Sequence, residues 1–299
     1  MCTDVALLAE KDADQIALDD LSKQSKEQSG ANAEITKSKV NELRTQIKAE
    51  KEMKAALKRA QKEFLKSLEN AVTIADPLSL LALSNEQLNE FIKNAGFSSA
   101  IVEFINQSDN IDKAINKTIS MVSPIAPDLP IIQQLDLIKV ATAQAVFDDV
   151  IIPSVASGVR DSLTAMSLQV PAKQAISGLA QKMTQSTGTQ LTVINTKLSM
   201  YGRSVSASLA DAAGLNYYLY TGPRDGLTRP FCKPLINKVV SESQMNKLNN
   251  GQGLPVKTAG GGYNCRHSWT PVSEGFITAA GLQKATSADI NKANARKKT

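Results

Sequence analysis

The sequence is poor in aromatic residues and nearly lacks histidine. Phe, Tyr and Trp make up 4% of its 299 residues, and it contains one tryptophan and one histidine. A single histidine, His267, would have to do all histidine-based proton transfer, and no carboxylate pair lies among dense polar residues. These shortages argue against an enzyme.

Long hydrophobic runs are also missing. No segment approaches the roughly 18 apolar residues of a membrane-spanning helix. The opening residues, MCTDVALLAEKDADQ, lack the basic start of a secretory signal. Three cysteines, one of them Cys2, are too few for a secreted disulfide framework. The sequence therefore predicts a protein made in the cytosol, with no membrane span.

Charge is distributed unevenly along the chain, whose net charge is +5. Residues 1–20 carry six acidic groups against one lysine, whereas residues 22–69 carry twelve bases and seven acids. The last 19 residues carry five bases and one acid. We expect an acidic, mobile leader over residues 1–30. For the basic tail, residues 279–299, two interpretations stay open: non-specific contact with nucleic-acid phosphates, or a solvated terminus.

A long helix is predicted over residues 31–76, because neither Gly nor Pro occurs between Ala31 and Ala75. Its apolar residues recur at spacings of three, four and seven, which indicates an imperfect coiled coil interrupted by Glu50 and Lys54. These apolar positions are Val40, Leu43, Ile47, Leu57, Phe64 and Leu68. The helix either pairs with another subunit or forms one arm of an intramolecular bundle.

Shorter helices are expected over residues 77–212, and they predict a helical bundle. The first follows a capping box at Ser84 and ends at Gly96. A new helix is expected to begin after Ser108 and Asp109, and the proline-rich residues 123–130 form a connector. The remaining helices are predicted at about 98–107, 131–152, 154–169 and 172–210.

The amino-acid composition changes in residues 213–278, which hold seven of the thirteen aromatic residues. Strands are predicted over 215–222, 253–257 and 265–272, with a short helix after a second capping box at Ser241. The predicted fold class is therefore α+β: a mostly α-helical N-terminal two-thirds followed by a small α+β module.

The module holds the most distinctive polar residues of the chain. Cys232, Cys265 and His267 are residue types that bind zinc, and Asp225 would complete a tetrahedral set. A Cys232–Cys265 disulfide and two buried, reduced thiols are alternatives. Asp225 and Arg229, four residues apart, are candidates for an ion pair. Arg266 should face away from its neighbours, and Trp269 should anchor the core.

These residues also form an ordered pattern. It reads Tyr220-x-Gly222-x-x-Asp225-x-x-Thr228-Arg229-x-x-Cys232, then Asn264-Cys265-Arg266-His267, then Pro271. The pattern resembles the C-terminal module of the phage Mu F-like family of head-morphogenesis, or minor head, proteins. The resemblance covers residues from about 200 to 275, and the upstream helices match only in kind.

The resemblance implies a structural protein of a tailed phage or prophage, made in the bacterial cytoplasm and located in the virion. Its partners would be portal, capsid or neck proteins, with the chain as a homo-oligomer or a portal-bound ring. It implies no catalytic residues and no cofactor beyond a candidate structural zinc. The alternatives are an internal protein ejected with the genome and, in a different functional class, an enzyme or toxin carrier that uses Cys265 and His267.

Overall fold

The structure is a computed structural model. It describes the backbone of residues 2–122 and 129–295, and the side chains of residues 13–122 and 130–295. The chain forms two compact units, each assembled from separate segments. Unit 1 comprises residues 1–48, 108–138 and 198–299, and unit 2 comprises residues 49–107 and 139–197. The predicted fold class, mostly helical α+β, is confirmed.

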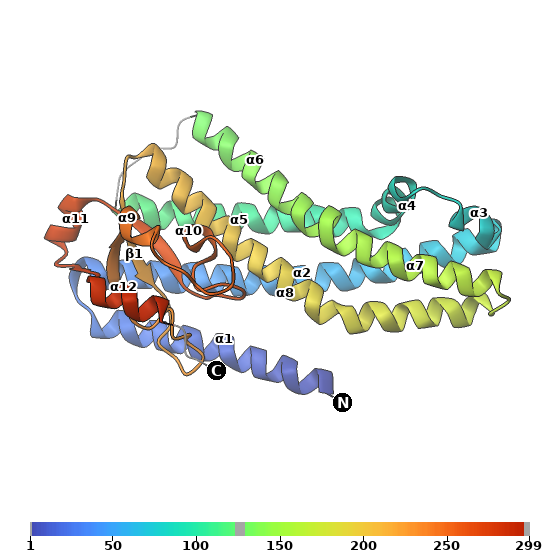
Figure 1. Cartoon of the computed structure of the whole chain (residues 1–299), viewed down its shortest axis with the longest axis horizontal. Coiled ribbons are helices and arrows are strands. Elements are labelled where there is room, and N and C mark those ends of the chain that lie inside the picture. The colour runs from blue at the N-terminus through green and yellow to red at the C-terminus, as the bar shows by residue number, and fades with distance from the viewer. Residues whose placement is uncertain (1, 123–128, 296–299) are drawn as a thin grey trace. The chain divides into compact units, whose positions relative to one another are not determined.

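Helices dominate the chain before residue 213 (Figure 1). They are α1 (Cys2–Glu27), α2 (Gly30–Ile74), α3 (Pro77–Leu81), α4 (Asn85–Ile92), α5 (Ser98–Val122), α6 (Leu129–Val146), α7 (Ile152–Ser167) and α8 (Ala172–Ala212). Two π-helical turns join them, η1 (Lys93–Phe97) and η2 (Phe147–Ile151). Within the described residues, no helix has an apolar stretch long enough to cross a bilayer.

The prediction that residues 1–30 form a mobile leader is wrong for the part of helix α1 whose side chains the structure describes, from residue 13 onward. Ala17 and Leu21 lie one turn apart and are buried. They form one hydrophobic cluster with Val40, Leu43 and Ile47 of α2. This apolar stripe gives the acidic segment a packed helical face despite its local charge.

Helix α2 confirms the long helix predicted over residues 31–76. All six of its predicted apolar positions are buried inside the chain. That burial favours the intramolecular arm over the alternative of pairing with another subunit.

Unit 2 packs its helices around phenylalanine rings. The Phe64 and Phe97 rings meet edge to face at 6.1 Å, as do Phe104 and Phe147. Gly96 allows this packing, because a Cβ there would lie 2.5 Å from the carbonyl oxygen of Ala60. The predicted capping box at Ser84 is present, and it begins α4.

One predicted helix boundary is wrong. Helix α5 runs unbroken through Ser108 and Asp109, because Phe104, Ile111 and Ile115 bury a continuous apolar face that outweighs the local capping preference. The predicted boundary at Pro153 is close to the observed one: the π-helical turn η2 ends at Ile151, and α7 begins at Ile152 with Pro153 in its first turn, where proline is tolerated. The predicted connector falls largely on residues 123–128, outside the described residues.

Unit 1 contains a four-stranded sheet in the order β3-β1-β2-β4. Its strands are β1 (Tyr217–Thr221), β2 (Lys238–Ser241), β3 (Ser268–Val272) and β4 (Gln283–Lys284). Strand β1 is antiparallel to both neighbours, whereas β4 runs parallel to β2. Short helices lie between and after the strands: α9 (Glu242–Met245), α10 (Val256–Ala259), α11 (Glu274–Ala279) and α12 (Ser287–Asn294).

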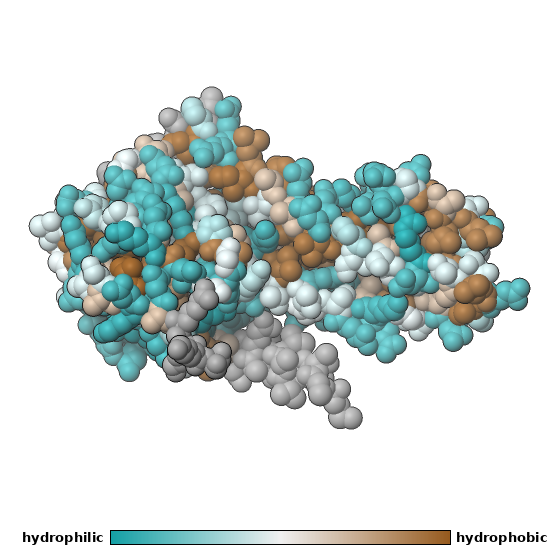
Figure 2. Space-filling view, in the orientation of Figure 1, coloured by the Kyte–Doolittle hydropathy of each residue, from teal (hydrophilic) through white to brown (hydrophobic). Residues whose placement is uncertain are grey.

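Alternation along β1 gives the sheet two buried faces. Tyr218 and Tyr220 join one hydrophobic cluster with Trp269, and Leu219 joins another that includes Ile35 of α2. The outer surface over α11 and α12 is mostly hydrophilic (Figure 2).

The module extends further than predicted. Residues 279–299 were expected to be a tail, but β4 and α12 belong to the sheet and its core, with Ile290 and Ala293 buried. Only residues 296–299 lie outside the described part. The predicted strand at 253–257 is instead the helical turn α10, begun by Pro255. Such short apolar runs do not distinguish strand from helix.

Candidate metal centre

Three of the four predicted metal ligands come together. The donor atoms of Cys232, Cys265 and His267 lie within 4.8 Å of one another, and all three side chains are buried. Cys232 lies in the turns between β1 and β2, and the other two residues immediately precede β3. The register of β1 against β3, with Thr221 opposite Ser268, brings the ends of these strands together.

The His267 ring has a defined orientation. Its Nε2 lies 2.9 Å from the carbonyl oxygen of Pro223. A carbonyl oxygen only accepts, so Nε2 carries the proton, and in the neutral imidazole Nδ1 keeps its lone pair. Nδ1 lies 3.9 Å from the Cys265 sulfur. Metal-binding histidines are commonly held in this way, with the other ring nitrogen bonded to a carbonyl.

Two neighbours hold the ring in place. The phenol ring of Tyr220 stacks on it at 5.2 Å and 14°. Gly222 faces it from the other strand end, where any side chain would overlap the imidazole. The glycine of the sequence pattern is therefore required by space rather than by an unusual backbone angle.

Hydrogen-bond donors surround the two sulfurs. The Tyr220 hydroxyl lies 3.4 Å from the Cys232 sulfur and 3.7 Å from that of Cys265. The Gly261 amide donates to the Cys265 sulfur at 3.1 Å. Burial raises the pKa of Tyr220, so its hydroxyl stays protonated and able to donate.

The two thiols shift each other's pKa in opposite directions. A hydrogen bond from Cys232 holds the pKa of Cys265 well below its usual range, with help from the positive charge of Arg203. The same hydrogen bond, together with burial, raises the pKa of Cys232. One sulfur is thus disposed to be a thiolate, the form that binds metals, while the other keeps its proton. Both thiols are free, so the alternative disulfide is not formed in this structure.

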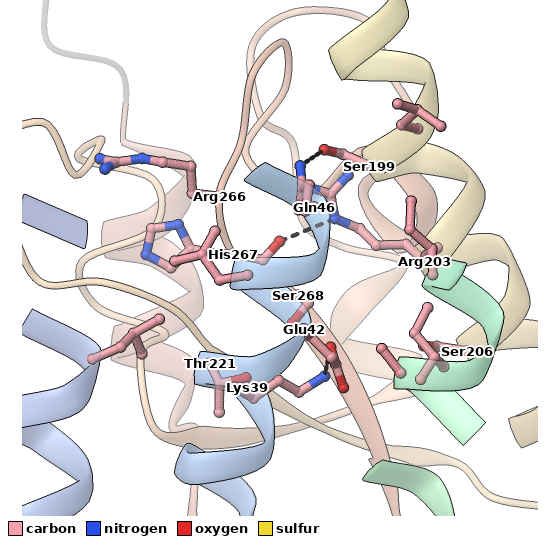
Figure 3. Close-up of a pocket in the computed structure, with 17 residues that line it drawn as sticks. Lys39, Glu42, Gln46, Ser199, Arg203, Ser206, Thr221, Arg266, His267 and Ser268 are labelled. Carbon is pink, nitrogen blue, oxygen red and sulfur yellow. Dashed lines mark hydrogen bonds and ion pairs between the residues drawn. The ribbon is translucent and has the colours of Figure 1, made fainter. Parts of the chain in front are cut away.

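Arg203 completes the centre, although it lies outside the sequence pattern and was not predicted to belong there. From α8 its guanidinium donates to the carbonyl oxygens of His267 at 3.0 Å, Thr258 at 3.1 Å and Cys265 at 2.5 Å. Figure 3 shows it reaching the main chain of His267 while the imidazole ring points away. The sequence held one signal of this role: Arg203 is the only charged residue between Lys197 and Asp211.

Asp225 is not a fourth ligand, and the prediction that it would be one is corrected. Its carboxylate forms an ion pair with Arg266 at 2.7 Å. The guanidinium thereby neutralises the negative charge of the carboxylate inside the module. Burial acts to raise the pKa of Asp225, but hydrogen bonds from Arg266, Thr228 and the Leu227 amide outweigh it, so the pKa is lowered.

The predicted Asp225–Arg229 ion pair is also wrong. Arg229 instead donates to the carbonyl oxygens of Gly261, at 2.9 Å, and Tyr263. It thereby ties the turns around Cys232 to the glycine-rich loop before Cys265.

The other residues of the pattern support the module from within. The Thr228 hydroxyl donates to the Pro223 carbonyl at 2.8 Å, and the Trp269 indole donates to the Val256 carbonyl at 3.0 Å. Asn264 adopts the left-handed conformation at φ 51°, and Pro271 lies opposite Tyr218 in the sheet. The prediction that Trp269 anchors the core is confirmed by its burial and its contact with Tyr220.

A small cavity lies beside His267 (Figure 3). Its volume is about 50 Å³, and Lys39, Glu42, Thr221 and Arg203 contribute to its lining. Ligand pockets usually measure about 300–1,000 Å³. This space therefore suits water molecules better than an organic substrate.

The donor set of the centre fits zinc. Two sulfurs and one imidazole nitrogen match the preferences of the ion, and the outer hydrogen bonds orient them. Among the described residues, no fourth Cys, His, Asp or Glu joins the three. Comparison of the chain with protein-family models, curated proteins and solved structures finds no match.

Proposed function

We propose that the chain is a non-enzymatic structural protein of a tailed-phage or prophage virion. It acts as a minor head protein at the portal, neck or capsid interior, in head assembly or DNA delivery. The proposal rests on the resemblance carried by residues 220–271. The observation that supports a structural role is that Cys232, Cys265 and His267 are buried together inside the module.

Burial of the nucleophile is the main argument against catalysis. A hydrogen bond from Cys232 lowers the pKa of Cys265, but the side chain is only 4% exposed, and His267 is equally buried. A catalytic thiolate has to reach a substrate carbonyl or phosphate, which requires an accessible site.

We propose that structural zinc occupies this centre, held by Cys232, Cys265 and His267. Zinc would link three segments that are separate in sequence: the turns before β2, the loop before β3 and, through Tyr220, strand β1. Because an unfolded chain has no preformed site, zinc-binding energy becomes folding energy. A small module of this kind gains most from such a link.

Contacts with other virion subunits would come from surfaces that the chain does not itself cover. The apolar positions of α2 are buried, whereas Ile132 and Leu137 on α6 are 46% and 72% exposed. A homo-oligomer or a portal-bound ring would use exposed hydrophobic side chains of this kind.

The test is the location and copy number of the protein in purified particles of the phage or prophage that encodes it. Cross-linking before and after triggered genome release should retain the protein at low copy number, linked to portal or capsid. Loss of the protein together with the DNA would instead identify an ejected internal protein. Absence from particles would refute both.

A further inference from the structure

An open groove of about 680 Å³ crosses the module, and none of the three candidate metal ligands lines it. Its walls come from the segment between β1 and β2 and from α12. Four basic side chains line it, Arg224, Lys233, Lys238 and Lys292, against two carboxylates.

Both carboxylates are already neutralised. Asp225 pairs with Arg266 at 2.7 Å and its side chain is only 1% exposed. Asp289 pairs with Lys238 at 2.6 Å. Among the described residues, no acidic group forms an ion pair with the other three bases, Arg224, Lys233 or Lys292, and all three are exposed.

The three bases stand on a rigid support. Phe231, Cys232 and Leu235, which flank Lys233, are buried in the module core. The Thr228 hydroxyl fixes the turn that follows Arg224 through its bond to Pro223. Helix α12 is anchored through Ile290 and Ala293 on either side of Lys292. The backbone that carries these three bases is thus anchored to the module core.

This arrangement selects a particular class of ligand. Each base is solvent-exposed, so a single small anion would gain little from it. A polymer with regularly spaced negative charges contacts several bases at once and releases its counterions. None of the described residues that line the groove is aromatic, so base stacking has no platform there.

We propose that this groove binds the phosphate backbone of double-stranded nucleic acid without reading its sequence. The proposal concerns the described bases Arg224, Lys233 and Lys292 and does not rest on the basic residues 296–298. It also does not depend on the proposed virion role, because DNA binding by the groove and presence in particles are measured separately.

The experiment measures binding of the full-length protein to a labelled DNA duplex of mixed sequence by fluorescence anisotropy, over a series of salt concentrations. The triple variant R224Q/K233Q/K292Q should bind about tenfold or more weakly at low salt. Its slope of log K against log salt should fall in magnitude by about 0.9 for each phosphate that the protein no longer neutralises. Two duplexes of unrelated sequence should behave alike.

Matched controls keep the result specific. K247Q removes an exposed charge of the same module outside the groove and should leave affinity within about twofold. R296Q/K297Q/K298Q removes the same charge as the triple variant. The proposal is overturned if this tail variant alone abolishes binding, or if the groove variant retains wild-type affinity and slope. It is also overturned if polyglutamate of equal charge displaces DNA as well as unlabelled duplex does, since the groove would then suit an acidic protein.

Discussion

Arg203 of α8 and His267 ahead of β3 are joined by a hydrogen bond of 3.0 Å from the guanidinium Nε to the main-chain oxygen. The same guanidinium reaches the carbonyl oxygen of Cys265, so one side chain fixes the backbone on both sides of Arg266. Two of the three metal donors are therefore positioned by a helix that supplies no ligand.

Replacing Arg203 with Met should destabilise the protein. The change leaves three carbonyl oxygens inside the module without their donor. Hydrogen bonds to a charged group contribute about 1.5–3 kcal/mol each, so we expect a loss of about 3 kcal/mol or more. Urea unfolding measures it. R44M, at an exposed position, should change stability by less than about 0.5 kcal/mol, and equal effects of the two variants would contradict the role assigned to Arg203.

Gly222 and Gly226 lie four residues apart and should respond in opposite ways to alanine. A methyl group at Gly222 overlaps the His267 ring, whereas one at Gly226 meets no atom within 4 Å. G222A should lose about 1–3 kcal/mol through overpacking, and G226A should be neutral or slightly stabilising. Thermal unfolding of the pair separates the two cases, and an unaffected G222A would show that the ring is not confined.

Purified protein should contain one zinc ion per chain, as determined by elemental analysis. D225N should keep the ion, because Asp225 pairs with Arg266 and does not contact the metal donors. C232S and H267A should lose the ion. Removing zinc from the wild-type protein with a chelator should lower its unfolding temperature. Restoring free zinc to about 100-fold above its dissociation constant should return about 2.7 kcal/mol. Full loss of the ion in D225N would reassign the ligands.

Zinc affinity should rise with pH. In the metal-free centre the pKa of Cys232 is raised by its hydrogen bond to Cys265 and by burial, so its thiol is protonated near neutrality. The incoming ion has to displace that proton, so log K should increase by about one for each pH unit. Competition with a zinc indicator between pH 6 and pH 8 tests this, and a flat profile would show that both sulfurs are ionised beforehand.

Asp289 should stabilise the protein only above mildly acidic pH. Its hydrogen bond with Lys238, with help from the Thr286 amide, lowers its pKa to about 2. An Asp with a lowered folded-state pKa contributes above its unfolded value of about 3.9, and the contribution is lost as pH falls towards 2. D289N should therefore cost about 1 kcal/mol at pH 6, after allowance for solvent screening, and nothing near pH 2. Denaturant unfolding between pH 6 and pH 2 checks whether the unfolding free energies of D289N and the wild type become equal.

Local signals in the sequence predicted local structure well. The absence of Gly and Pro located α2, and the capping boxes at Ser84 and Ser241 located the starts of α4 and α9. These signals work because helix formation and capping depend on residues a few positions apart. The cluster of Cys232, Cys265 and His267 was found from residue chemistry, because only a few residue types bind zinc.

The errors concern residues whose structure is decided by distant parts of the chain. Ser108 and Asp109 resemble a helix start, but the helix continues because its apolar face is buried. Asp225 has a metal-binding side chain, yet its partner is Arg266, 41 residues further on. Residues 287–294 are polar enough to be taken for a tail, and only Ile290 and Ala293 reveal their place in the core.

Assembly of unit 1 from three separate segments has a consequence for synthesis on the ribosome. Helix α1 is made early, but its Asp20 accepts from the Arg224 amide and its Gln24 receives a hydrogen bond from Asn237. The module core that holds those residues also needs Ile290 and Ala293. The first helix must therefore wait for its polar partners until almost all of the described chain has been translated. Folding of unit 1 is then a late event, and a chain stalled before α12 exposes an incomplete core to chaperones and proteases.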